Sequence, residues 1–203
     1  METKTLVIVT GCPGSGKSSF AQRLSRAFPE SRLYSYDRLK ERYFDRCGFD
    51  NEEEKTRLNE QSLQEFYRIL DREMAAGEPL IIEYPFCKKH ESALRDLTER
   101  HGYRAVTLLL TGELPVLYRR GVQRDQGAGR HPGHLLRRYH KGQPWSAGDL
   151  EPVMDYASFA ASCAEKDYNI CVGKTLRVDV TDMDAVDTEA LWKTVRQALS
   201  EDA

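Results

Sequence analysis

A glycine-rich segment near the N-terminus constrains the fold more than any other part of this sequence. Residues 11–18 match the pattern G-x-x-x-x-G-K-[ST] at every position, which is the pattern of a phosphate-binding loop. The apolar, β-branched residues 5–10 precede the motif, and residues 18–28 have the composition of a helix. A strand, a glycine-rich turn and a helix in this order predict an α/β fold. The same order lets the loop amides and the helix N-terminus point at one anion.

Each position of the motif has a separate chemical role. The glycines allow backbone conformations that a Cβ would forbid, so the loop can turn its N–H groups inward. We expect Lys17 to reach the β- and γ-phosphates and the Ser18 hydroxyl to bind Mg²⁺. ATP and Mg²⁺ are therefore the predicted cofactors. The predicted nucleotide-binding residues of the loop are Gly11, Cys12, Pro13, Gly14, Ser15, Gly16, Lys17, Ser18 and Ser19.

Strand-like and helix-like segments alternate along the rest of the chain. The predicted strands are residues 5–10, 33–36, 80–84, 105–110 and 176–180. The predicted helices are residues 18–28, 52–76, 88–101, 114–123, 149–164 and 184–199. This alternation predicts a mostly parallel sheet covered by helices on both faces. A chain of 203 residues suits one domain, predicted over residues 1–203.

Composition excludes several other classes of protein. The formal net charge of −2 gives no overall sign of a nucleic-acid or membrane partner. The chain has no apolar run long enough for a transmembrane helix and no signal peptide, so we expect a cytoplasmic protein. The five cysteines form no C-x-x-C pair, which argues against a disulfide framework or a structural zinc site.

Two acidic residues follow predicted strands, at the sheet edge where ligands of such folds bind. Asp37 could accept the proton of an acceptor hydroxyl, or it could merely cap a helix that begins at Arg38. Arg38 is itself a candidate for binding the acceptor. Glu83 ends the apolar run 80–83 in the Walker-B arrangement. It could contact Mg²⁺, bind the acceptor, or simply terminate a buried strand.

Arginines are concentrated between residues 119 and 141. Arg120 and Arg124 lie one helical turn apart, a spacing that lets both contact adenine and phosphate. Arg130 lies in the Gly- and Pro-rich segment 127–134 and could close over the transferring phosphoryl group. The alternative is a solvated basic helix face. We predict a lid over residues 119–145, and the predicted catalytic residues are Lys17, Asp37, Arg120, Arg124 and Arg130.

Three histidines of this region raise the question of a metal site. His131, His134 and His140 do not have the spacing of two ligands on one helix face, and no acid partner lies near them in the sequence. Contact with the acceptor, or simple loop polarity, is therefore favoured over metal binding.

Four spaced elements carry a resemblance to a known family. They are residues 11–18, the pair Asp37-Arg38, the strand ending at Glu83, and the pattern L-Y-R-R-x-x-x-R over residues 117–124. The chain resembles the small P-loop kinases grouped with polynucleotide kinase, chloramphenicol phosphotransferase, gluconate kinase and zeta toxins.

The resemblance implies a three-layer α/β sandwich with a five-stranded parallel sheet in the order 2-3-1-4-5 and a helical lid. It also implies that Asp37 is the catalytic base, that Arg120 and Arg124 contact ATP, and that residues 180–184 lie near the adenine. The sequence departs from the family at Glu83, where many members carry aspartate. The composition of the metal shell therefore stays open.

The function predicted from these observations is ATP-dependent transfer of the γ-phosphate to a hydroxyl group, with a small molecule favoured as acceptor. A polynucleotide 5′-hydroxyl is the alternative, because Tyr118, Tyr139 and Trp145 lie among the arginines. A regulatory nucleotide-binding ATPase without an acceptor is a third possibility, although the base-specificity motif N-K-x-D is absent. The identity of the acceptor, the choice between ATP and GTP, and the oligomeric state are left open by the sequence.

Overall fold

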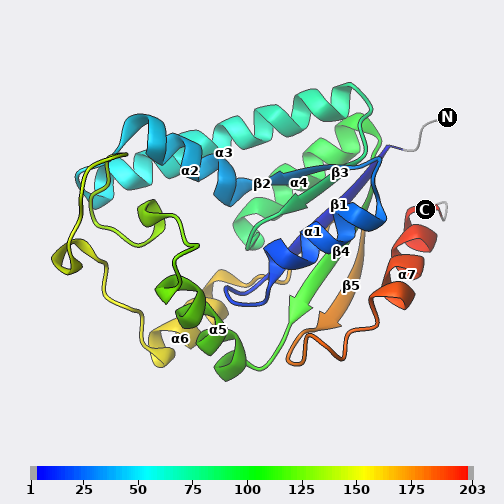
Figure 1. The fold of residues 1–203 in the computed structure, drawn as a ribbon. Helices are drawn as coiled ribbons and strands as arrows, with labels where there is room; N and C mark the ends of the chain where they lie inside the picture. The colour runs from blue at the N-terminus through cyan, green and yellow to red at the C-terminus, as the bar shows by residue number, and fades with distance from the viewer. Residues whose placement is uncertain (1–3, 201–203) are drawn as a thin grey trace.

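The computed structural model describes residues 4–200 and has the alternating architecture that the sequence predicts (Figure 1). The strands are β1 (Thr5–Gly11), β2 (Arg32–Ser35), β3 (Leu80–Glu83), β4 (Arg104–Thr111) and β5 (Lys174–Asp179). The helices are α1 (Lys17–Ala27), α2 (Tyr36–Cys47), α3 (Glu52–Ala75), α4 (Lys88–His101), α5 (Leu114–Gln126), α6 (Tyr156–Lys166) and α7 (Thr188–Ser200). Two short 3₁₀ turns, Pro132–His134 and Ala147–Asp149, lie between α5 and α6.

The five strands form one parallel sheet in the order β2-β3-β1-β4-β5. This confirms the predicted fold class and strand order. Strand β1 lies in the middle, where Val7 pairs with Ile81 on one side and with Val106 on the other. Because helices cover both faces of this strand, its sequence is a continuous apolar run instead of an alternating one.

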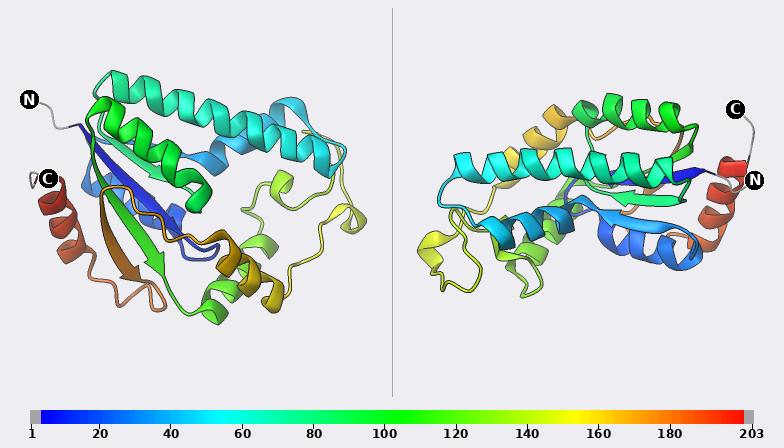
Figure 2. Two further views of the ribbon diagram at one scale, coloured as in Figure 1. Left: turned by 180° about the vertical axis from the view of Figure 1, so that it is seen from behind. Right: turned by 90° about the horizontal axis from the view of Figure 1, so that it is seen from above.

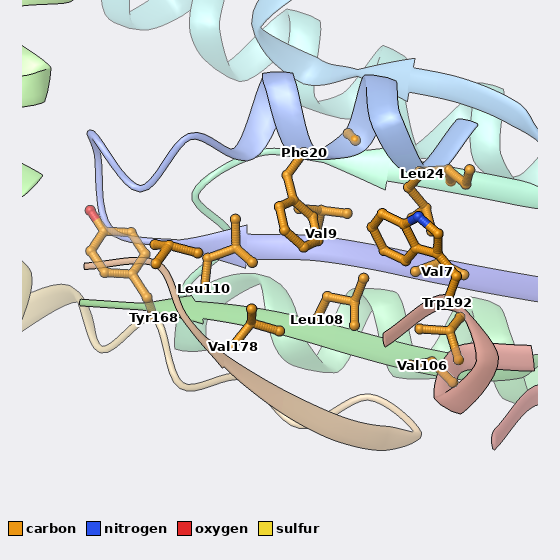
Figure 3. Packing of buried hydrophobic residues seen from close by; sticks show 14 of the residues in the cluster. Val7, Val9, Phe20, Leu24, Val106, Leu108, Leu110, Tyr168, Val178 and Trp192 are labelled. Carbon is orange, nitrogen blue, oxygen red and sulfur yellow. The ribbon is translucent and has the colours of Figure 1, made fainter. Parts of the chain in front are cut away.

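Residues of β1 alternate between two apolar clusters, one on each face of the sheet. Val7 and Val9 face α1 and α7, where Phe20 and Trp192 meet edge to face with ring centres 5.3 Å apart (Figure 3). The cluster on the other face of the sheet contains Leu6 and Ile8 together with side chains of α3 and α4. Helices α3 and α4 lie above the sheet and α1 lies below it in the right-hand view of Figure 2.

The structure moves several predicted boundaries, and the differences at three helix starts have the most bearing on the site and its lid. Helix α2 begins at Tyr36, which the sequence assigned to the preceding strand, and the Ser35 hydroxyl accepts its capping hydrogen bond from the amide of Arg38 (3.4 Å). Helix α6 begins at Tyr156 instead of residue 149, because Asp155 caps it through the amide of Ser158 (2.7 Å). Helix α7 begins at residue 188 instead of 184.

The segment 127–155, which joins α5 to α6, runs beside the far ends of α2 and α3 (Figure 1). Its backbone pairs with the α2–α3 connection through an antiparallel bridge between Phe49 and Tyr139. The ammonium of Lys55 in α3 donates to the carbonyl of Leu136 (3.1 Å) and pairs with Glu151. Much of the predicted lid is thus attached to the α2–α3 pair. Among residues 4–200, no helix has both the length and the apolar composition needed to span a bilayer.

Candidate functional site

The phosphate loop lies where β1 ends and α1 begins, at the carboxyl edge of the sheet. Gly14 adopts φ +81°, in the left-handed region that side chains rarely occupy. A Cβ at this position would lie 2.0 Å from the carbonyl oxygen of Leu117 in α5. The loop therefore packs directly against the backbone of α5, the helix that leads into the predicted lid.

Lys17 is the first residue of α1, and its side chain folds back over the loop. Its ammonium donates to the carbonyls of Gly11 (3.0 Å) and Cys12 (2.9 Å), and the residue is 8% exposed. Burial lowers the pKa of Lys17 to about 8, although the carboxylates of Glu83 and Asp37 oppose this effect. The ammonium is thus a nearly desolvated charge held at the loop by two carbonyls, a suitable donor for an incoming phosphate.

The residues predicted to hold Mg²⁺ are adjacent. The hydroxyl of Ser18 lies 3.3 Å from each carboxylate oxygen of Glu83, which is buried at the end of β3. Burial raises the pKa of Glu83, and hydrogen bonds from Ser35 and Ser18 oppose this only in part. One hydroxyl and one carboxylate fit Mg²⁺, which takes few protein ligands and completes its shell with water and phosphate oxygens.

Asp37 lies in the first turn of α2, across from the loop. Ser35, not Asp37, caps this helix. The Oδ1 atom of Asp37 pairs with the ammonium of Lys40 (2.8 Å), and Oδ2 lies 3.7 Å from the guanidinium of Arg130. Burial alone would raise the pKa of Asp37, but the charges of Lys40, His134 and Arg130 hold it well below the usual range. The carboxylate is therefore ionised at neutral pH.

The three predicted lid arginines occupy different positions. Arg120 donates to the carbonyls of Val180 (2.6 Å) and Thr181 (2.9 Å), so its guanidinium fixes the loop after β5. The Nε of Arg124 donates to Asp125 (2.8 Å), and the charge of Arg124 lowers the pKa of Lys17. Arg124 therefore lies near the phosphate loop, whereas Arg120 contacts the segment expected near the adenine.

Arg130 lies between two carboxylates. Its guanidinium is 3.7 Å from Asp37 and 3.5 Å from Asp125, and its side chain is 18% exposed. The Nε atom makes the 3.5 Å contact with Asp125, but within residues 4–200 this buried N–H has no partner with hydrogen-bond geometry. A buried donor left in this state favours binding an additional anionic oxygen.

One cavity of about 100 Å³ brings together five of the predicted residues, namely Ser18, Asp37, Arg38, Glu83 and Arg130. It is lined by Ser18, Gln22, Leu33, Ser35, Asp37, Arg38, Glu41, Glu83 and Arg130. Gln22 and Glu41 were not predicted from the sequence, although Gln22 follows Ser18 by one helical turn and shares its face. A larger cavity of about 590 Å³ lies at the opposite edge of the sheet and contains none of the predicted residues.

The sequence profile of a family described as an AAA domain matches residues 7–141, which is more than half of the chain. This chain belongs to that AAA-domain family. The match includes the phosphate loop, Asp37, Glu83 and the three arginines. No curated protein matches the sequence of this AAA-domain chain.

Solved structures with similar folds cover nearly the whole AAA-domain chain. A protein from Chloroflexus aurantiacus j-10-fl, provisionally described as a kinase, has a TM-score of 0.78 at 24% identity and covers 98% of this chain and 99% of its own. A gluconokinase from Sinorhizobium meliloti 1021 has a TM-score of 0.54 at 17% identity, with coverage of 98% and 94%. A shikimate kinase from Bacteroides thetaiotaomicron has a TM-score of 0.55 at 15% identity, with coverage of 97% and 99%. These likenesses show that the AAA-domain chain has the fold of P-loop kinases.

The three histidines do have acid partners, although none lies near them in the sequence. Helix α2 and the segment after it carry an acid for each of the three histidine rings. Glu41 pairs with His134 (3.0 Å), Asp45 with His131 (3.1 Å) and Asp50 with His140 (2.9 Å). These partners are 86 to 93 residues away in the sequence, which is why local spacing did not reveal them. In the described part of the chain, no three His, Cys, Asp or Glu residues form a group that could hold a metal.

Proposed function

We propose that this protein is an ATP-dependent phosphotransferase that moves the γ-phosphate of ATP to a hydroxyl group of a small molecule. The observation that carries the proposal is the cavity that joins Ser18 of the phosphate loop to Asp37 and Glu83. A phosphate donor site and an ionised carboxylate then face one another across a space large enough for a reacting group. The kinase folds among its structural relatives support the same reaction class.

The proposed roles follow from the contacts of each side chain. Lys17 exchanges its two loop carbonyls for phosphate oxygens, and the loop amides bind the remaining oxygens. Ser18 and Glu83 would hold Mg²⁺, which offsets phosphate charge when bound. Asp37 orients the acceptor hydroxyl and takes its proton.

Arg130 has a second role in this proposal. In the structure its guanidinium lies against Asp37, the residue that must receive the acceptor. Arg130 is proposed to leave Asp37 for the oxygens of the transferring phosphoryl group, joined by Arg124, and so to stabilise the charge of the transition state. This exchange also opens the carboxylate to the acceptor hydroxyl and excludes water from the reaction.

Two observations support a small acceptor over a polynucleotide. The cavity beside Asp37 is only about 100 Å³. Of the three aromatic residues that suggested base stacking, Tyr118 packs on Phe159 and Tyr139 donates to Asp45, while Trp145 remains 51% exposed. The gluconokinase and shikimate kinase relatives are named for small hydroxyl compounds, which fits the same class of acceptor.

The proposal extends to the family group, the domain organisation and the location of the protein. We place the chain with the polynucleotide kinase and chloramphenicol phosphotransferase group, on the strength of Asp37-Arg38 and the 117–124 pattern. The chain is proposed to work as one kinase domain over residues 1–203, with residues 119–145 as its lid. A cytoplasmic location stays a prediction from the sequence.

The direct test is a transfer screen with [γ-³²P]ATP. Pooled sugars, other small hydroxyl compounds and 5′-hydroxyl oligonucleotides are offered as acceptors, and labelled products are separated. Label on a small compound is the expected result. Label on the oligonucleotides, with binding that weakens steeply as salt increases, would favour the polynucleotide alternative. Hydrolysis of ATP with no labelled acceptor would favour the regulatory ATPase.

Binding of MgATP is expected to take up about half a proton at pH 8 and about a tenth at pH 7. The pKa of Lys17 in the free protein is about 8, so half of the amine is neutral at that pH. Bound phosphate raises the pKa and restores the proton. Calorimetry in buffers with different ionisation enthalpies measures the uptake, and heats independent of the buffer at pH 8 would contradict this account of Lys17.

A further inference from the structure

Lys40 of α2 occupies an aromatic cage beside Asp37. Its ammonium lies 5.3 Å from the centre of the Tyr36 ring and 4.9 Å from the centre of the Tyr84 ring. These distances are typical of cation–π contacts. The two rings meet edge to face with their centres 4.5 Å apart, and the Lys40 side chain is only 12% exposed.

The cage is itself anchored to other parts of the fold. The hydroxyl of Tyr36 donates to the carbonyl of Asn59 in α3 (2.6 Å) and lies 3.2 Å from the hydroxyl of Ser62. The ring of Tyr84, which follows β3, packs against Phe86 with ring centres 5.5 Å apart. Contacts from α2, α3 and the segment after β3 therefore restrict the position of the lysine.

The two oxygens of Asp37 have different surroundings as a result. Oδ1 is held by Lys40 at 2.8 Å, within ordinary ion-pair distance. Oδ2 has, among the described residues, the longer contact of 3.7 Å with Arg130, and both residues line the cavity. When Arg130 moves away, Oδ2 is the oxygen left without a close cationic partner.

We propose that Lys40 is a positioning residue: it fixes Oδ1 of Asp37 so that Oδ2 receives the proton of the acceptor. The inference rests on the proposed function. In the transfer, the acceptor oxygen bonds to the γ-phosphorus as its proton passes to Oδ2. The bond from the γ-phosphorus to the β,γ-bridging oxygen breaks, and its electron pair leaves with ADP. The proton on Oδ2 is released to water after the products leave.

Several charged or titratable groups face Asp37, and among the described residues Lys40 makes the shortest ion pair with it, at 2.8 Å against 3.7 Å for Arg130. The others come from α1, α2, β3 and the segments after β3 and α5: Lys17, Tyr36, Glu41, Glu83, Tyr84, Arg130 and His134. Burial raises the pKa of Asp37, and Lys40 is the strongest of the groups that lower it. Removal of Lys40 should therefore raise this pKa, and a replacement that keeps the positive charge should not.

The first measurement needs no acceptor and no turnover. The carboxyl ¹³C signal of Asp37, assigned by its absence in Asp37→Asn, is followed from pH 8 down to about pH 2. Wild type and Lys40→Arg are expected to show the same low pKa of Asp37. Lys40→Met and the polar variant Lys40→Gln are expected to raise the pKa of Asp37, so that its titration begins at a higher pH than in the wild type. Arg42→Met, which removes a positive charge from an exposed position of the same helix, is the matched control and should behave as wild type.

The second measurement is single-turnover hydrolysis of MgATP, with water as the acceptor. Lys40→Met and Lys40→Gln are expected to lower the rate about tenfold at pH 7, and their rate should fall further toward acid pH. Their Kd for MgATP should stay within about twofold of wild type. Lys40→Arg should restore both the rate and the pH profile. A lysine with a merely structural role would change stability without moving the profile.

The outcomes separate this inference from the proposed function. An unchanged Asp37 titration in both uncharged variants would overturn the role of Lys40, whatever the rates. The role of Lys40 would also be overturned if the uncharged variants lost rate with an unchanged pH profile and Lys40→Arg did not restore the rate. An Asp37→Asn enzyme with the wild-type rate would instead refute Asp37 as the base, while the titration would still report on the contact with Lys40.

Discussion

Asp37→Asn is expected to lower the rate of phosphate transfer by about 10²–10⁴ while leaving MgATP affinity nearly unchanged. Asparagine has the same shape as aspartate, but its amide cannot take the proton of the acceptor hydroxyl. Asp37 lies in the cavity that leads to Ser18, and its two oxygens contact Lys40 and Arg130 instead of the phosphate loop. The measurement is the rate of label transfer from [γ-³²P]ATP, together with MgATP binding by calorimetry.

Asp96→Asn provides the control for this experiment. Asp96 is an exposed acid on α4, and its loss removes the same charge from the protein. Its rate is expected to stay within about twofold of wild type. If Asp37→Asn transfers phosphate as fast as this control, Asp37 is not the base and the proposed mechanism is wrong.

Gly14→Ala is expected to destabilise the protein by about 2–4 kcal/mol and to weaken MgATP binding at least about tenfold. The new Cβ would lie 2.0 Å from the carbonyl oxygen and 2.8 Å from the carbonyl carbon of Leu117. Both atoms belong to the backbone of α5, so the loop or the helix must shift. The shift would displace the amides that are proposed to bind phosphate.

Gly77→Ala separates crowding from backbone strain. Gly77 has φ +80°, almost the same as Gly14 with φ +81°, but no described atom would lie within 4 Å of its Cβ. This variant is expected to cost about 1–2 kcal/mol from the left-handed conformation alone and to bind MgATP as wild type. Urea unfolding and nucleotide titration of both variants make the comparison. If Gly14→Ala and Gly77→Ala lost equal stability and equal MgATP affinity, the contact of the loop with α5 would not be the cause of the effects of Gly14→Ala.

The sequence predicted the fold because its strongest signals are local. The strand before the phosphate loop is a continuous apolar run. The eight-residue motif 11–18 then indicates the turn that joins this strand to the following helix. The strand order came from the family resemblance, and the sheet confirms it. The boundaries of α2 and α6 were missed because the capping hydrogen bonds of Ser35 and Asp155 decide them, and composition does not reveal which of several polar residues forms the cap.

The site was predicted in part, for a similar reason. Ser18, Asp37 and Glu83 were found because each follows a strand or belongs to a motif, and parallel strands bring such positions to one edge. The pairs between His134 and Glu41 and between Arg120 and the carbonyls of residues 180 and 181 join distant parts of the chain. Side-chain partners of this kind depend on how the helices pack against one another. Local sequence patterns do not reveal that packing.

Titration of MgATP into the wild-type protein shows whether residues 11–18 bind a nucleotide. Saturable binding at one site per chain is expected, and binding at least about tenfold weaker to Lys17→Met, which keeps the length of the side chain but not its charge. If calorimetry detects no binding of any purine triphosphate in magnesium buffer, residues 11–18 do not form a nucleotide site and the proposed function fails.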